Sequence, residues 1–229
     1  MVLGQPIRNL LTYTGVEWED KTYEISPPDG PGRQAWENDK NDGLGLDFPN
    51  LPYYIDGDVK LSQSLSIIRH LGRKHGLYGQ TEEEQCRQDM AEQQHVDLKM
   101  AMIRAVYFQF VCALRDLPTP ESKAEYLEGA LPTHLKLFTK FIGDRNWLLG
   151  DRLTYVDFLW YEVLDWQLYL DPECFKDFPV VRDFIERFEN LPKIKEYLKS
   201  DKFQKWPLFG SMALWGHKEE GMKLRFPDG

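Results

Sequence analysis

The stretch that decides the fold runs from Asp47 to Ser64 and reads Asp47-Phe48-Pro49-Asn50-Leu51-Pro52-Tyr53-Tyr54-Ile55-Asp56-Gly57-Asp58-Val59-Lys60-Leu61-Ser62-Gln63-Ser64. Two short strand-like runs flank Asp56-Gly57-Asp58, which is typical turn chemistry for a hairpin. Pro52 cannot donate a ladder hydrogen bond, which suits a cis junction ahead of the first run. Ser64 opens a helical pattern, and free backbone N–H groups at such a start attract an anion. We therefore expect a hairpin followed directly by an anion site.

Composition restricts the class of protein. The chain has 229 residues, 42% of them hydrophobic and 14% aromatic, which is typical of a globular protein with a sizeable core. A net charge of -9 argues against nucleic acid or an anionic membrane as the main partner, so an anion site must be local. Three cysteines without a Cys-x-x-Cys pair favour neither a disulfide framework nor a metal site. The first residues do not resemble a signal peptide, and we expect a cytoplasmic protein.

The N-terminal third mixes helical and extended patterns. Residues 5–14 predict a helix that stops at Gly15. Lys21 to Ile25 has β character, Ser26 to Gln34 predicts an irregular loop, and Trp36 to Asp42 predicts a short helix or turn. Glycines followed by an acidic run place a domain boundary near residue 80.

The rest of the chain predicts helices throughout. An apolar stripe from Cys86 to Leu114 predicts one long helix, and residues 121–142 predict another with a bend at Pro132. Thr154 to Asp157 is a capping box ahead of an apolar helix. Two prolines, Pro179 and Pro192, suit the first turns of two further helices.

These motifs resemble a known family. Asp47 to Tyr53, followed by Gln63-Ser64, resembles the glutathione-binding segment of cytosolic glutathione transferases, most of all the mu class. The resemblance continues through residues 91–94, 135–138, 154–158 and 184–189, and it spans about residues 4 to 216. It implies an α/β domain followed by an all-α domain: a thioredoxin-like, glutathione-binding part at residues 1–80 with its first strand truncated, an all-helical part at 81–216, and a tail at 217–229.

The resemblance also implies an activity and a set of site residues. The activity is conjugation of the thiolate of glutathione, a co-substrate rather than a cofactor, to small hydrophobic electrophiles for detoxification by a homodimer. The implied glutathione contacts are Arg33, Trp36, Lys40, Asn50, Leu51, Pro52, Gln63, Ser64 and Asp97, with Asp97 reaching across the dimer and Tyr107 lining the second-substrate pocket.

One feature departs from the family. The mu class carries a Leu-Gly-Tyr-Trp strand whose tyrosine hydroxyl meets the glutathione sulfur, whereas this sequence begins Met1-Val2-Leu3-Gly4-Gln5 and has no tyrosine before Tyr13. We expect the strand, or the link that bears the tyrosine, to be missing. We therefore assign no catalytic residue. A catalytically weak or inactive binding protein for apolar ligands, or an enzyme with an incomplete N-terminus, stays an alternative to an active transferase.

Several of these residues have a plainer interpretation. Gln63 and Ser64 could simply cap a helix, and Trp36 could be a half-buried surface aromatic. Phe48 is a dimer contact in the family but alone indicates an ordinary core residue. Tyr107 lies beside the long apolar stripe, where core packing competes with a pocket role. His95 has no metal-ligand partners at useful spacing, and we expect it at the surface or an interface.

Overall fold

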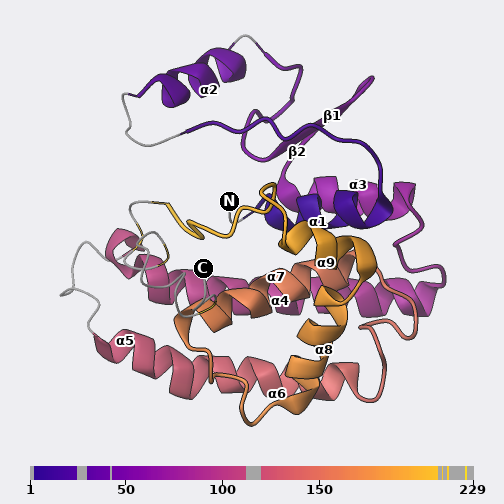
Figure 1. Ribbon diagram of the computed structural model, residues 1–229, viewed down its shortest axis with the longest axis vertical. Helices are drawn as coiled ribbons and strands as arrows, with labels where there is room; N and C mark the ends of the chain where they lie inside the picture. Colours follow the sequence, from indigo (N-terminus) through magenta and orange to yellow (C-terminus); the bar gives the residue numbers. More distant parts are fainter. Residues whose placement is uncertain are drawn as a thin grey trace.

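The computed structural model describes residues 3–24, 30–41, 43–111, 120–210, 213, 216 and 225; the side chains of 107–111 and 120–122 fall outside this description. The elements stack in layers, as Figure 1 shows. Helix α2 (Pro31–Asn41) and a hairpin lie at one end, helices α1 (Gln5–Thr14) and α3 (Ser64–Lys74) come next, and the remaining helices fill the other end.

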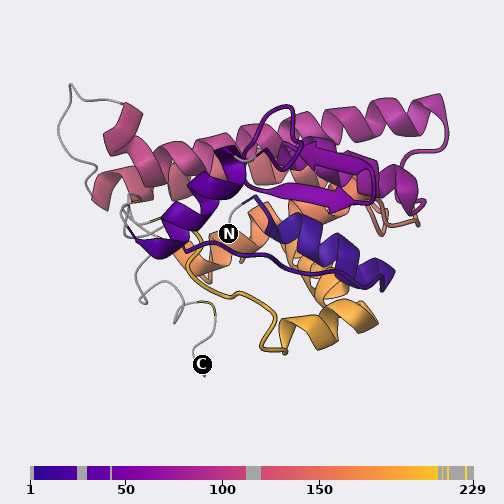
Figure 2. The ribbon, with the colours of Figure 1, turned by 90° about the horizontal axis from the view of Figure 1, so that it is seen from above.

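The first helix forms as its sequence predicts. Its apolar residues Ile7, Leu10 and Leu11 are buried, and α1 packs on α3, α7 (Tyr155–Leu170) and α9 (Pro192–Leu198). The helix ends because Gly15 adopts a φ of 75°, a left-handed conformation that glycine reaches without steric cost. Figure 2, seen from above, shows α1 to one side of the hairpin, whose strands contact α3.

The hairpin is the expected one. Strands β1 (Tyr53–Asp56) and β2 (Val59–Ser62) pair antiparallel, with Tyr53 opposite Ser62 and Asp56 opposite Val59. Within the described residues the sheet has two strands. The fold therefore combines a small α/β region with the helical region that follows.

Two local expectations ahead of the hairpin are wrong. Residues 21–24 of the expected strand at Lys21 to Ile25 form no ladder; Tyr23 and Lys21 instead bond through their side chains to Asp39 of α2, and Ile25 lies outside the described residues. The expected loop at Ser26 to Gln34 ends early, because α2 begins at Pro31, whose fixed φ suits a first helical turn. Residues 26–29 also lie outside the described part.

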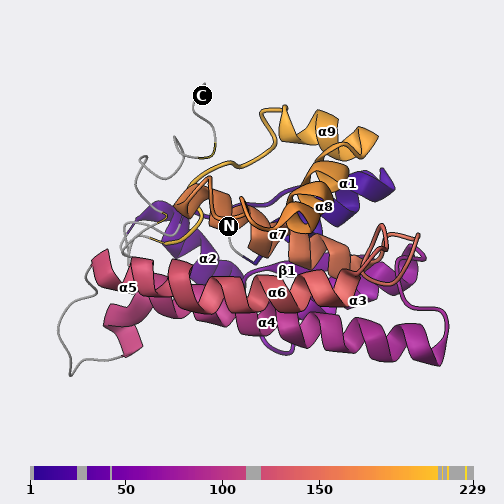
Figure 3. The ribbon, with the colours of Figure 1, turned by 90° about the horizontal axis from the view of Figure 1, so that it is seen from below.

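The long helix α4 (Glu82–Val111) crosses the molecule, and Figure 3 shows it running alongside α6 (Leu131–Ile142). Before α6 come the short helix α5 (Pro120–Glu125) and a π-helical turn, Tyr126–Ala130. The irregularity expected at Pro132 takes the form of this π-helical turn, which ends at Ala130, two residues before the proline. Pro132 has no N–H to offer the carbonyl four residues back, so the regular bonding pattern is interrupted just ahead of it.

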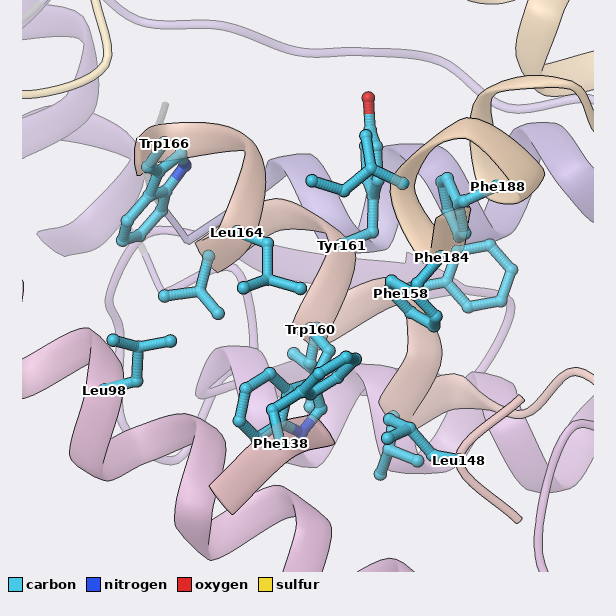
Figure 4. Packing of buried hydrophobic residues seen from close by; sticks show 14 of the residues in the cluster. Leu98, Phe138, Leu148, Phe158, Trp160, Tyr161, Leu164, Trp166, Phe184 and Phe188 are labelled. Atoms are coloured by element: carbon cyan, nitrogen blue, oxygen red, sulfur yellow. The ribbon is translucent and has the colours of Figure 1, made fainter. Parts of the chain in front are cut away.

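Helix α7 forms the centre of the core. It begins at the predicted capping box, in which Thr154 and Asp157 satisfy each other's backbone N–H groups, and nearly all its residues are buried. Figure 4 shows its aromatic side chains Phe158 and Tyr161 facing Phe184 and Phe188 of α8 (Pro179–Glu189), with Trp160 turned toward Phe138 of α6. Tyr161 stacks on Phe188 with ring centroids 4.1 Å apart. Because α7 packs on both sides, the hairpin and its helices rest on a rigid platform.

None of the helices in the described ranges combines the length and the apolar character that crossing a membrane requires.

Candidate functional site

The site is built around the junction between β2 and α3. Gln63 has a φ of 68° and a ψ of 108°, the only positive φ among the described non-glycine residues. Such a conformation costs free energy in a residue with a Cβ and is typical of functional sites. Ser64 then begins α3, and the first intrahelical bond runs from the Ile67 N–H to the Gln63 carbonyl, 3.0 Å apart. The N–H groups of the first turn ahead of Ile67 therefore have no acceptor within the helix.

The plain capping interpretation of Gln63 and Ser64 is not what the structure shows. No side chain caps α3 at its N-terminus, although both residues carry suitable oxygens. Gln63 is exposed and Ser64 is half-buried. The junction thus presents open donors and a positive helix end to solvent, which is the arrangement that binds a carboxylate.

Aromatic rings fix helix α2 against the hairpin. Trp36 is buried, with 7% of its surface exposed, which corrects the half-buried interpretation. Its ring stacks on Tyr53 of β1 at a centroid distance of 6.4 Å and an interplanar angle of 12°, and meets Tyr23 edge-on at 5.4 Å. The hydroxyls of Tyr23 and Tyr53 lie 3.0 Å apart, and the Tyr23 hydroxyl donates to Asp39. Trp36 thus positions α2 beside the hairpin.

The same network decides the ionisation of Tyr23. Burial, together with the hydrogen bonds to Asp39 and Tyr53, raises the pKa of Tyr23 far above its usual value. Its hydroxyl therefore stays protonated and acts as a donor in the physiological range, not as a base.

Two cations lie on α2. Arg33 is exposed and pairs with Glu37 one turn later, Nε to Oε1 at 3.1 Å. Lys40 is exposed in the last turn, on the same helix that Trp36 holds against β1. Both side chains can reach an anion at this end of the molecule, although the Arg33 guanidinium also pairs with Glu37.

The loop ahead of β1 presents its backbone as expected. Leu51 and Pro52 are half-buried, and the peptide bond between them is cis. The Leu51 N–H donates to Oδ1 of its neighbour Asn50 at 2.9 Å, and Asn50 is itself exposed. The amide edge of this loop is therefore occupied by a side chain that a ligand would have to displace.

Asp97 lies on the face of α4 opposite the residues that share a pocket with Ser64. It is exposed on α4, and its charge acts on His134 of α6, partly opposing the burial that lowers the pKa of that imidazole. Residues two apart on a helix do not share a face, and it is His95 and Lys99 of α4 that line a pocket with Ser64. Within one chain, Asp97 and Ser64 are not brought together.

Neither tyrosine discussed in the sequence is described at the site. Tyr107 belongs to α4, but its side chain lies outside the described residues, so its role stays a prediction. Tyr13 lies near the end of α1 and packs edge-on against Phe158 in the core, with centroids 5.6 Å apart. Tyr13 is therefore a core residue, as its place in the helix predicts.

The position expected for His95, at the surface or an interface, is wrong. His95 is 3% exposed, not at the surface, and Nδ1 has no hydrogen-bond partner among the described residues. Burial lowers the pKa of His95 to about 3, with the neighbouring charge of Lys99 acting in the same direction. The imidazole is therefore neutral.

Sequence reasoning also missed a buried ion pair beside His95. Glu92, fully buried, accepts hydrogen bonds from Arg69 of α3, with the Arg69 Nε 2.7 Å away, and from the Tyr155 hydroxyl of α7 at 2.8 Å. Pattern alone could not reveal it, since a glutamate in a polar stretch ordinarily predicts an exposed position. Across the described part of the chain, no cluster of three or more His, Cys, Asp or Glu residues could hold a metal ion.

Comparison with known proteins gives a consistent result. The family described as "Glutathione S-transferase, C-terminal domain" matches residues 103–201. Glutathione S-transferase Mu 2 of Macaca fascicularis is 45% identical over 216 residues, which is 94% of each chain. Glutathione S-transferase B of Cavia porcellus is 46% identical over 216 residues, covering 94% of this chain and 95% of that one.

Solved structures agree in fold. The glutathione S-transferase Blo t 8 superposes with a TM-score of 0.79 at 34% identity, covering 94% of this chain and 95% of that one. The Pi-class glutathione S-transferase of Onchocerca volvulus gives 0.75 at 30% identity, with 92% and 94% covered. Identity of this degree over nearly the whole chain, together with the open α3 N-terminus after a hairpin, leads to one conclusion: the chain belongs to the glutathione S-transferase family, in its mu class.

Proposed function

We propose that this chain binds reduced glutathione and conjugates its thiol to small hydrophobic electrophiles. The observation that carries the proposal is the junction at Gln63 and Ser64, where an unusual backbone conformation leads into a helix whose first N–H groups have no partner. Glutathione carries two carboxylates, and an uncapped helix N-terminus is a ready binding site for one of them. The mu-class relatives support the assignment of the ligand.

Each part of glutathione can be assigned to a group of residues at the site. The γ-glutamyl carboxylate would meet Gln63 and Ser64, and the glycyl carboxylate would meet Lys40 and Arg33 on α2. The cysteinyl unit would pair with the backbone at Leu51, next to Pro52, after displacing the side chain of Asn50. Trp36 supports this arrangement, because it holds α2 beside β1. Each carboxylate contact is charge-assisted, the stronger type of hydrogen bond.

The chemical step is a nucleophilic displacement or addition. The thiol releases its proton to solvent, the sulfur lone pair forms a new S–C bond with the electrophile, and any leaving group departs with its bonding electrons. An apolar electrophile would bind beside the sulfur, and Tyr107 is our candidate for that pocket. Conjugation of this kind would make foreign electrophiles soluble, which is a detoxifying role.

Assembly as a homodimer is part of the proposal. Phe48 is 72% exposed, which is unusual for so large an apolar side chain and contradicts its interpretation as a core residue. Asp97 is exposed, as a residue serving a partner's site would be in a single chain. We also infer a domain boundary near residue 80, supported by the start of α4 at Glu82, with residues 81–216 as the helical domain and 217–229 as a tail. A cytoplasmic location stays a prediction.

Titration calorimetry with reduced glutathione tests the binding proposal. Replacing Gln63 and Ser64 together with alanine removes side-chain contacts to one carboxylate, and we expect at least tenfold weaker binding, since a hydrogen bond to a charged group contributes about 1.5–3 kcal/mol. Exposed Gln80, changed to alanine, serves as the control and should bind like the wild type. A folded wild-type protein that gives no heat of binding would exclude the proposed function.

A further inference from the structure

Two acidic side chains of the helical region bind an arginine from the C-terminal tail. Asp165 of α7 and Glu189, the last residue of α8, both accept hydrogen bonds from the Arg225 guanidinium. The Arg225 Nε lies 2.9 Å from Asp165 Oδ1, and its Nη2 donates to Glu189 Oε1. One side chain therefore bridges two helices. This geometry suits a guanidinium, which presents several N–H groups in one rigid plane.

The contact is largely withdrawn from solvent. The side chains of Asp165, Arg225 and Glu189 keep 8%, 20% and 28% of their surface exposed. Ion pairs in full contact with water contribute little, because water competes for both partners. At a largely buried pair, removing one partner leaves the other charge without compensation. We therefore expect this contact to hold the chain around Arg225 more firmly than an exposed ion pair does.

Tyr161 positions one of the two acceptors. Its hydroxyl donates to Glu189 Oε1 at 3.1 Å, and the same oxygen accepts from Arg225. Figure 4 shows this hydroxyl pointing away from the aromatic cluster, in which the Tyr161 ring stacks on Phe188. Because the stacked ring is fixed in the core, its hydroxyl holds the Glu189 carboxylate in place whether or not an arginine is bound.

The acidic pair depends on Arg225 for its positive charge. Burial raises the pKa of Asp165 and that of Glu189, and the charge of Arg225 opposes both shifts. Burial alone would lower the pKa of Arg225, but the charges of Asp165 and Glu189 raise it above its usual value. Within the described part of the chain, no other basic side chain forms an ion pair with either carboxylate. Without Arg225, two buried acidic groups would face each other without a cation.

The chain that leads to the tail is also fixed on α7. Phe209 packs edge-on against Trp166, with ring centroids 5.5 Å apart, and its N–H donates to the Gly216 carbonyl at 3.0 Å. Trp166 follows Asp165 in the sequence and lines a small pocket together with Ser64. The contacts of the C-terminal part therefore lie on the helix that also forms a wall behind Ser64.

We propose that Asp165, Glu189 and Tyr161 form a binding site for a guanidinium group, and that the C-terminal tail uses this site as a latch by inserting Arg225. The site includes none of the residues assigned to glutathione, so it stands independently of the proposed function. Its occupant is an arginine of the same chain, seated on both carboxylates. Because the contact is not covalent, the tail can leave and return by a local opening while the helices stay folded.

Acidification should open this latch. When Arg225 leaves, nothing opposes the effect of burial on Asp165 and Glu189, so their pKa values rise further and the released state binds more protons. Release is therefore favoured as pH falls, and this begins at a higher pH than for ordinary carboxyl groups.

The titratable groups around the pair do not change this direction. Burial raises the pKa of Tyr161 and that of Tyr169, so both stay protonated in this range. Burial and the charge of Asp165 raise the pKa of Glu162 to about 8, so that it is largely uncharged near neutral pH, and Arg8 of α1 acts on Glu162.

An endoprotease specific for arginine tests the latch directly. The protease must take the Arg225 guanidinium into its own pocket before it cuts the bond to Phe226, so a docked Arg225 is protected. Mass spectrometry of the full chain follows the loss of residues 226–229. A free peptide of residues 221–229 contains the same bond and gives the rate for an unbound arginine at each pH. At pH 7.5 we expect the full chain to be cut about tenfold more slowly than the peptide, or slower still.

Neutral substitutions of the acceptors should release the tail. We expect Asp165→Asn and Glu189→Gln each to speed the cut after Arg225 about tenfold, because each removes one charge from the site. Asp183→Asn, the same change at an exposed site on α8, should cut like the wild type. From pH 7.5 to pH 5.5 the protection of the wild type should fall toward that of the double variant, whose protection should not depend on pH.

The fragments separate release of the tail from unfolding. A variant that unfolds would be cut after many arginines, whereas a released tail loses residues 226–229 and leaves the rest of the chain whole. A wild type that is cut as fast as the peptide would overturn the proposal. Unchanged protection in both acceptor variants would also overturn it, and an effect of one variant alone would exclude a site shared by the two helices.

Discussion

The buried carboxyl group of Glu162 connects the stability of this protein to pH. It is 6% exposed on α7 and accepts a hydrogen bond from the Trp166 ring N–H at 2.8 Å. Burial and the charge of Asp165 raise its pKa to about 8 from a usual 4.5. Between these values the folded chain holds a proton that the unfolded chain releases, so the free energy of unfolding falls as pH rises through this window.

Glu162→Gln should remove the part of that dependence that Glu162 contributes, leaving the smaller part from Asp157, whose pKa burial raises to about 6. A single proton contributes a slope of at most about 1.4 kcal/mol per pH unit, so the wild type should lose stability relative to the variant from pH 5 to pH 8. Urea unfolding at four pH values in this range measures both curves. Glu186→Gln, the same change at an exposed site on α8, controls for the chemistry. Parallel pH profiles for wild type and Glu162→Gln would show that this carboxyl ionises normally in the folded state.

At this scale, sequence predicted backbone roles better than side-chain environments. The helix start at Ser64 and the cis bond at Pro52 follow from turn chemistry and the motif, and the structure confirms both, whereas the positive φ of Gln63 was not predicted. His95 and Glu162 are buried because of what packs over them from other helices, which no local pattern encodes. The contacts of the individual site residues with glutathione stay predictions.

At the scale of elements, Glu92 joins three helices. Its carboxylate on α4 accepts from Arg69 on α3 and from Tyr155 on α7, and Glu92 is fully buried. Removing one partner of a buried pair leaves the other without compensation, which usually costs several kcal/mol. Arg69 keeps 39% of its side chain exposed, so water replaces part of the loss. We expect Glu92→Ala to lower the free energy of unfolding by about 2–3 kcal/mol.

Chemical denaturation, which gives the free energy of unfolding, tests this by comparing Glu92→Ala with a variant of an exposed ion pair. Asp56 pairs with Lys74, and both side chains are more than 40% exposed, so Asp56→Ala should cost less than about 1 kcal/mol. Should the two variants lose equal stability, Glu92 would contribute no more than a surface ion pair, and the joint between α3, α4 and α7 would rest on apolar packing alone.

The helix ends could be predicted from sequence where a cap, a glycine or a proline alone determines them. The capping box at Thr154, the stop at Gly15 and the prolines opening α8 and α9 all lie where predicted. The prediction was wrong at Lys21 to Ile25, where a strand requires a neighbour to pair with and the described residues supply none. Local propensity indicates which secondary structure a segment can form, but a segment with strand propensity becomes a strand only where a neighbouring strand pairs with it.

At the scale of the whole molecule, two exposed residues, Phe48 and Asp97, favour assembly as a dimer. Asp97 lies on the face of α4 opposite the residues that share a pocket with Ser64, so a site that uses both, as proposed above, would take Ser64 from one chain and Asp97 from a partner related by a twofold axis. In such an arrangement Phe48 of each chain would enter the helical part of the other. Burying a phenylalanine contributes about 2 kcal/mol or more per copy, enough to matter for assembly at micromolar concentration.

Sedimentation velocity at micromolar concentration tests the dimer. The wild type should sediment at about twice the monomer mass of 26.9 kDa. Phe48→Ser should shift the equilibrium toward monomer at least tenfold, because two apolar side chains are removed from the interface, one per copy. Leu137→Ser removes another exposed apolar residue, 46% exposed on α6, and should leave the mass unchanged. A wild type that remains monomeric would contradict the roles proposed for both Phe48 and Asp97, because each role is a contact with a partner chain: Phe48 with its helical part and Asp97 with its glutathione site.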